Sequence, residues 1–176
     1  MNSQTVNYND SDHYGDNVFT SLSSLEQAVE EIKRALGGNC DAVEIIENLA
    51  DYIAEFPDRN IIGLEEKLVN GGRSELYSRA LILKNRFERK IAKNQMSLVE
   101  QHIYVQILST ITSIWYSKIK PLIDMNEPKK IVDKVIYDEL IEPVHKAVVR
   151  YDILATSELV SGMLYYLTGK CHLVWD

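Results

Sequence analysis

Apolar residues recur every three or four positions along most of the chain, a spacing that gathers them on one face of an α-helix. The pattern predicts helices over 23–36, 41–56, 75–93, 98–119 and 156–169, a longer helical segment over 128–149, and a short helix near 62–70. Ser23 with Glu26, and Ser97 with Glu100, have the spacing of a capping box at two of the helix starts. The chain is therefore predicted to be a bundle of six to eight helices.

The segment 98–119 is apolar over a wide arc, which is typical of a helix that is buried on more than one side. It is our candidate for the central helix, and we expect its Trp115 to be largely buried. Pro121 lies just beyond its predicted end. Pro143 falls inside the segment 128–149, and it should break or kink that helix because proline has no N–H to donate.

The two ends of the chain follow other patterns. Residues 1–20 are rich in Asn, Asp, Ser and Tyr, and they predict a polar tail or a short β ribbon with a turn at 14–17. The segment 171–175, Cys-His-Leu-Val-Trp, alternates and is β-prone, so it could pair with such a ribbon. We expect an all-α fold with short β-prone segments at both termini, in which residues 21–176 form a single helical domain.

Composition narrows the class of protein. A chain of 176 residues, 45% of them hydrophobic, can bury a core of its own. No apolar run reaches the about 18 residues of a membrane span, and the N-terminus lacks the basic and apolar regions of a signal peptide. Two cysteines, Cys40 and Cys171, are too few for a disulfide framework. We therefore expect a cytoplasmic protein without a membrane partner.

Motifs for chemistry are weak. The neighbouring Cys171 and His172 suggest metal ligands or a nucleophile, but the sequence has no CxxC ligand spacing and no phosphate-binding glycine loop. The simpler interpretation is a small buried cysteine and a histidine bonded to the backbone. We predict no catalytic, cofactor-binding or metal-binding residue and no enzymatic activity. A small helical ligand-binding protein is one alternative.

One charged segment stands out. Residues 73–93 hold seven basic and two acidic residues in a chain whose net charge is −7. On a helix, four of the basic side chains fall within about 60° of one another, namely Arg79, Arg86, Lys90 and Lys93. This basic stripe is either a solvated helix face or a docking site for an acidic protein or a nucleic-acid backbone. The overall negative charge favours the protein partner.

The C-terminal sequence GMLYYLTGKCHLVWD resembles the closing motif of the helical C-terminal domains of bacterial ABC three-component systems, which are similar in organisation to Lamassu-type defence modules. The resemblance is strongest over 133–176. It implies an accessory subunit without enzymatic activity, which mediates oligomerisation and docking in a homo-oligomer or a hetero-complex. The implied partners are an SMC-like ABC ATPase and an effector or middle component, with DNA reached through them.

Because only about 20 residues precede the first predicted helix, we expect a stand-alone form of this family, without an effector domain of its own. The alternative function is that of a nucleic-acid-binding accessory protein that uses the basic helix 73–93.

The ending also makes a structural prediction. Gly162 should let its helix lie close to a neighbour, and Gly169 should supply a left-handed turn into the last segment. Alternation then places Trp175 and the other odd-numbered residues on one face, and His172 and Val174 on the other. We expect one face to pack on the bundle and the other to meet a partner, with Trp175 as an anchor. The predicted partner interface comprises Gly162, Tyr165, Tyr166, Gly169, His172, Val174 and Trp175.

Overall fold

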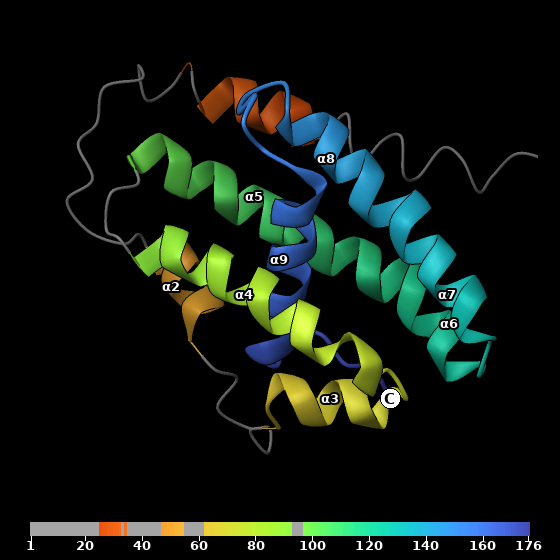
Figure 1. Ribbon diagram of the computed structural model, residues 1–176. Coiled ribbons are helices and arrows are strands. Elements are labelled where there is room, and N and C mark those ends of the chain that lie inside the picture. The colour runs from red at the N-terminus through yellow and green to blue at the C-terminus, as the bar shows by residue number, and fades with distance from the viewer. Residues whose placement is uncertain (1–24, 33, 35–46, 55–61, 93–96) are drawn as a thin grey trace, which may run out of the picture.

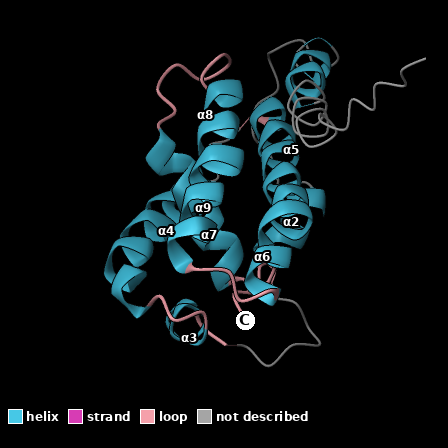
Figure 2. Ribbon diagram, turned by 90° about the vertical axis from the view of Figure 1, so that its right-hand side faces the viewer, coloured by secondary structure: helices cyan, strands magenta, loops and turns pink. Residues whose placement is uncertain are grey.

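The computed structural model describes residues 25–32, 34, 47–54, 62–92 and 97–176, which form a bundle of helices (Figure 1). In this part of the chain most residues are helical and none belongs to a strand (Figure 2). The prediction of an all-α fold is confirmed. The predicted ribbon of residues 1–20 lies outside the described residues, and the segment 171–175 is coil instead of strand.

The bundle is assembled from short and long helices in chain order. After the helical residues 25–32, the elements are α2 (Glu47–Ile53), α3 (Leu64–Asn70), η1 (Ser74–Leu76), α4 (Tyr77–Ala92), α5 (Leu98–Ile114), η2 (Trp115–Ile119), α6 (Lys120–Asp124), α7 (Lys129–Val135), η3 (Ile136–Ile141), α8 (Glu142–Val148) and α9 (Ser157–Gly169). None of the helices described here is both long enough and apolar enough to cross a membrane.

Two helical paths run through a proline, whereas the sequence pattern predicts an end near 119 and a break or kink at Pro143. α5, η2 and α6 continue past Pro121, and α7, η3 and α8 continue past Pro143. Each proline follows a π-helical turn, η2 or η3, in which the amide just before the proline donates to the carbonyl five residues earlier. Proline cannot donate to the carbonyl four residues back, and its ring crowds that carbonyl. The wider π turn accommodates both effects, so the helix neither ends at 119 nor breaks at Pro143.

Side-chain caps mark the N-termini of two core helices, α5 and α9. At the start of α5, the hydroxyl of Ser97 accepts from the amide of Glu100 at 3.2 Å, and the amide of Ser97 donates to the Glu100 carboxylate at 2.9 Å. The predicted capping box is thus confirmed. At the start of α9, the hydroxyl of Thr156 accepts from the amide of Leu159 at 3.2 Å. Caps of this kind each contribute about 1 kcal/mol to stability.

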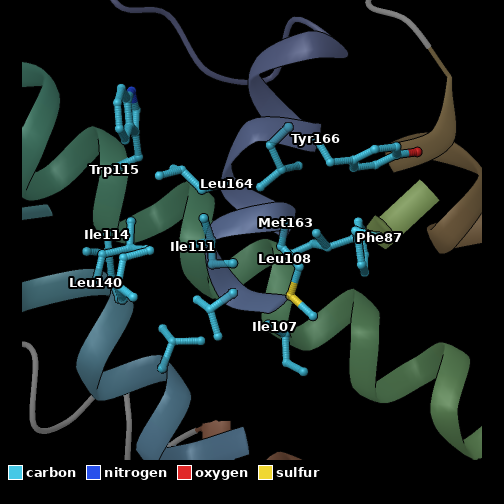
Figure 3. Close-up of a cluster of buried hydrophobic side chains, with 14 of the residues drawn as sticks. Phe87, Ile107, Leu108, Ile111, Ile114, Trp115, Leu140, Met163, Leu164 and Tyr166 are labelled. Carbon is cyan, nitrogen blue, oxygen red and sulfur yellow. The ribbon is translucent and has the colours of Figure 1, made fainter. Parts of the chain in front are cut away.

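The core lies where α9 packs between α4 and α5 (Figure 1). Figure 3 shows the side chains that meet there, from α4, α5, η2, η3 and α9: Phe87, Ile107, Leu108, Ile111, Ile114, Trp115, Leu140, Met163, Leu164 and Tyr166. Trp115 is fully buried, as predicted. α5 contacts α2, α8 and α9, so it is buried on several sides, and α9 shares this central position because it contacts α3, α4, α5 and α8.

Gly162 sets the close approach of α9 to α4. A Cβ atom at this position would lie 2.6 Å from the carbonyl oxygen of Leu83 and 3.2 Å from its carbonyl carbon. Backbone atoms cannot move aside as the end of a side chain can, so only glycine fits without shifting a helix. This confirms the predicted role of Gly162, and it places the C-terminal motif where α9 lies close to α4.

Candidate interaction site

α9 ends in a Schellman turn that redirects the chain. The amide of Cys171 donates to the carbonyl of Thr168 at 3.2 Å, and the amide of His172 donates to that of Leu167 at 2.9 Å. Cys171 occupies the left-handed position with a φ of 67°, whereas Gly169 is the last residue of the helix. The prediction that Gly169 supplies the left-handed turn is therefore wrong. Because a side chain in this conformation costs about 1–2 kcal/mol, the packing of the following residues must offset it.

Two side chains of η2 hold the backbone of the C-terminal segment, which we define as residues 170–176. The indole N–H of Trp115 donates to the carbonyl of Val174 at 3.2 Å. The hydroxyl of Tyr116 donates to the carbonyl of His172 at 2.8 Å. Side chains of a distant helix thus satisfy the backbone acceptors that a neighbouring strand would satisfy in a sheet, so the segment lies against the bundle as coil.

Trp175 is the most important residue in the packing of the C-terminal segment on the bundle, which we call the closure. Its side chain is 2% exposed, and its ring centroid lies 4.7 Å from that of Trp115. Its N–H donates to the hydroxyl of Thr168 at 3.0 Å, and the buried ammonium of Lys67 donates to the carbonyl of the same Thr168 at 2.6 Å. The guanidinium of Arg73 lies 5.1 Å from the Trp175 ring centroid, in the geometry of a cation–π contact.

The connection between α3 and α4 forms the other wall of the Trp175 site. A Cβ atom on Gly71 would lie 2.9 Å from Cβ of Trp175, so the absence of a side chain makes room for Trp175. Arg73 donates twice to Oδ1 of Asp133, from Nε at 3.0 Å and from Nη2 at 2.8 Å, and so joins this connection to α7. Arg73 is 3% exposed, which removes it from the basic surface that its segment predicts.

Burial along the C-terminal segment alternates as predicted. The odd-numbered residues from 171 to 175 are buried, and His172 and Val174 are half-buried. Within the predicted partner interface, Gly162, Tyr166 and Trp175 are buried inside this chain, whereas Tyr165, Gly169, His172 and Val174 reach the surface in part. The motif thus leaves His172 and Val174 half-buried at the surface, and the ring of Trp175 packs inward.

The basic stripe is an exposed face of α4 that carries its own counter-ions. The side chains of Arg79 and Arg86 are 74% and 56% exposed, and both pair with Glu158 at the start of α9, at 3.5 Å and 2.9 Å. Lys90 lies 3.7 Å from Asp152. Lys93 lies outside the described residues. Two carboxylates from the α9 end of the bundle therefore reduce the positive charge that the sequence pattern indicates.

A structured turn lies beside this stripe. Between α8 and α9, Ile153 and Leu154 are each 84% exposed, the largest values among the exposed large apolar side chains that the structure describes. Leu154 also lines a shallow hollow of about 280 Å³ between the turn and α4, together with Leu83, Arg86, Lys90, Asp152, Thr156, Glu158 and Leu159. Apolar and basic side chains thus share one surface.

Two largely buried tyrosines, Tyr104 and Tyr151, lie close to Asp152 of this turn. Burial raises the pKa of the Tyr104 and Tyr151 hydroxyls, so both stay protonated at neutral pH. The ammonium of Lys90 lies 5.6 Å from the ring centroid of Tyr104 as well as beside Asp152. Lys90 is thus less exposed than the two arginines of the stripe, because its side chain is 37% exposed against 74% for Arg79 and 56% for Arg86.

Sequence reasoning missed the features that depend on distant contacts. Lys67 and Arg73 are charged, yet they are buried against the C-terminal segment, and no local pattern distinguishes them from surface residues. The exposed Ile153 and Leu154 lie in a connection that carried no predicted element. No group of three or more His, Cys, Asp or Glu residues is close enough to hold a metal ion within the part of the chain that the structure describes.

Comparison with protein families identifies a relative for most of this unit. A model of the family CTD9, described as C-terminal domain 9 of the ABC-three component (ABC-3C) systems, matches residues 63–175. The match covers more than half of the chain, from the start of α3 through Trp175. Comparisons with curated proteins and with solved structures found no match.

Proposed function

Because the chain belongs to the CTD9 family of ABC-three component (ABC-3C) systems, we propose that it is an accessory subunit without enzymatic activity in a Lamassu-like defence assembly. In this role it mediates oligomerisation and docking of an SMC-like ABC ATPase and of an effector or middle component. Membership of a system with several components supports the existence of such partners. DNA is reached through these partners instead of through this chain.

The roles of Cys171 and His172 support the absence of enzymatic activity. A thiol and an imidazole are the side chains of the closing motif that could take part in catalysis, and here both contribute to the packing of the fold. Cys171 forms the left-handed cap, with its thiol buried and 3.8 Å from the carbonyl of Ile62. The ring of His172 lies 5.3 Å from that of Tyr52 and its backbone receives the Tyr116 hydroxyl. The motif shared with the family therefore builds a closed domain end, which is what an interaction module requires.

The docking role would use side chains that stay partly exposed once the C-terminal segment has packed on the bundle. His172 and Val174 are half-buried, and the Tyr116 side chain that bonds the His172 backbone is 39% exposed, so one edge of the C-terminal segment reaches the surface in part. Tyr165, elsewhere on α9, is half-buried, and this partial burial raises the pKa of its hydroxyl. Tyrosine at such a rim gives a partner both apolar area and a hydrogen-bonding group.

Co-purification tests the proposal. The tagged full chain is expressed with the ABC ATPase and the middle component that its own system encodes, and the retained proteins are identified after washes at increasing salt. We expect at least one component to be retained in a stable ratio, and a tagged unrelated helical domain to retain none. Retention of neither component would contradict the proposal. Binding of the isolated chain to duplex DNA with a steep salt dependence would favour the alternative function.

A further inference from the structure

The turn between α8 and α9 displays two aliphatic side chains on an ordered backbone. The amide of Leu154 donates to Oδ1 of Asp152 at 3.0 Å, and the amide of Ala155 donates to the carbonyl of Asp152 at 2.9 Å. Ala155 is buried, and its carbonyl contacts Nε2 of His145 at 3.2 Å. The flanking residues therefore fix the turn, while Ile153 and Leu154 contribute nothing to the core of this chain.

The face of α4 beside this apolar pair is basic. Arg79, Arg86 and Arg89 are exposed on α4, and Lys90 lines the hollow next to Leu154. Three of these cations pair with two carboxylates, Arg79 and Arg86 with Glu158 and Lys90 with Asp152. Ile82 is 55% exposed and lies one helical turn from Arg86. The surface is therefore apolar at its centre and carries a positive excess at its rim, in a chain whose net charge is −7.

The composition of the surface distinguishes between kinds of partner. A nucleic-acid backbone is bound by cations, and bases stack on aromatic rings, so two exposed aliphatic side chains would add little to either contact. A protein segment rewards both features, because apolar side chains bury against Ile153 and Leu154 while carboxylates meet the arginines. The hollow of about 280 Å³ lies below the about 300–1,000 Å³ of small-molecule sites and suits one or two inserted side chains.

We propose that Arg79, Ile82, Arg86 and Arg89 of α4, together with Ile153 and Leu154, form a docking surface for an acidic segment of another component of the ABC-3C assembly. The inference rests on the proposed function and names the place and the chemistry of the contact. Apolar side chains of the segment cover Ile153 and Leu154, and one of them enters the hollow beside Leu83. Aspartate or glutamate side chains of the segment pair with Arg86 and Arg89.

Two double variants test the two halves of the surface. Ile153→Ser with Leu154→Ser removes the apolar centre, and Arg86→Glu with Arg89→Glu reverses the rim. All four side chains are exposed, so thermal unfolding should stay close to that of the parent. A matched control, Ile131→Ser with Tyr137→Ser, removes two exposed apolar side chains from α7 and η3, where they are 46% and 53% exposed. Each full-length variant is titrated against the purified ATPase and the purified middle component.

We expect the serine variant to weaken binding of one component by about tenfold or more, because buried apolar anchors carry most of an interface's energy. The glutamate variant should weaken binding most at low salt, since screening reduces the contribution of rim charges. The control variant should bind as the parent does. Wild-type binding by both surface variants would overturn the inference while the proposed function stands. Failure of the parent itself to bind either component would overturn both. A glutamate variant that loses only affinity for duplex DNA would instead identify the surface as a nucleic-acid site.

Discussion

Replacement of Trp175 by alanine tests whether the C-terminal segment is part of the core. The substitution removes a ring that is 2% exposed, along with its contact with Trp115, its bond to the Thr168 hydroxyl and the cation–π contact with Arg73. Truncation of a buried tryptophan costs about 3–5 kcal/mol. For a protein of this size each kcal/mol lowers Tm by about 2–4 °C, so we expect a decrease of about 6–20 °C.

The assay is thermal unfolding followed by far-UV circular dichroism, with Trp175→Phe as the matched variant. Phenylalanine keeps most of the aromatic bulk but cannot donate to Thr168, so its cost should be smaller, about 1–3 kcal/mol for the oxygen left without a donor. The chain has two tryptophans, and their ring centroids lie 4.7 Å apart. Emission from either variant therefore reports Trp115 alone and shows whether its environment changes.

The hypothesis from sequence, in which Trp175 anchors a partner, leads to the opposite result. It requires the alanine variant to fold as the parent does and to fail in assembly. If the variant melts within about 2 °C of the parent and no longer co-purifies with the ATPase or the middle component, the packing described here is wrong and Trp175 belongs to the interface.

Three further substitutions test individual contacts. Gly162→Ala should lower the free energy of unfolding by about 1–3 kcal/mol because its Cβ meets the α4 backbone. Gly63→Ala is the control, because a Cβ there would have no atom within 4 Å, and its free energy of unfolding should stay close to that of the parent. Equal urea midpoints for the two variants would refute the close approach. Ser97→Ala should cost about 1 kcal/mol through loss of the cap of α5 and Ser97→Asp should restore most of it, so an alanine variant as stable as the parent would contradict the capping role. Arg73→Met should cost about 1.5–3 kcal/mol, since the charge-assisted bonds to Asp133 are lost; no change in urea midpoint would show that this ion pair contributes nothing.

Much of the helical framework could be predicted because it depends on local spacing. The wide apolar arc of 98–119 gave the buried α5 with Trp115 at its end, and the Ser97–Glu100 spacing gave its cap. The alternation of 171–175 also predicted which of these residues are buried, although the segment is coil. Periodicity reports which side of a segment is apolar, and burial follows from that even where the hydrogen-bond partners differ from those expected.

Other features could not be read from local spacing, because they depend on residues that are distant in the chain. Proline forbids one backbone hydrogen bond, but whether a helix stops or widens into a π turn is decided by the packing that holds both sides, as at Pro143. Gly71 has the pattern of a helix stop, yet its missing side chain makes room for Trp175 more than 100 residues later. The carboxylates that pair with the basic stripe belong to Asp152 and Glu158, which lie more than 60 residues after Arg86 and Lys90 in the sequence.

The two ends of α9 link the closure to the proposed docking surface. The first turn of α9 holds Glu158, beside Arg86 and the exposed turn, and its last turn holds Thr168, which Lys67 and Trp175 contact. Loosening the closure can therefore displace the turn without touching it, so weaker partner binding by Trp175→Ala would not by itself make Trp175 a contact residue. The variant at Ile153 and Leu154 separates the two effects, because it alters the surface and leaves the closure intact. A docking contact requires that variant to lose binding at unchanged stability, whereas an effect transmitted through α9 requires binding and stability to fall together.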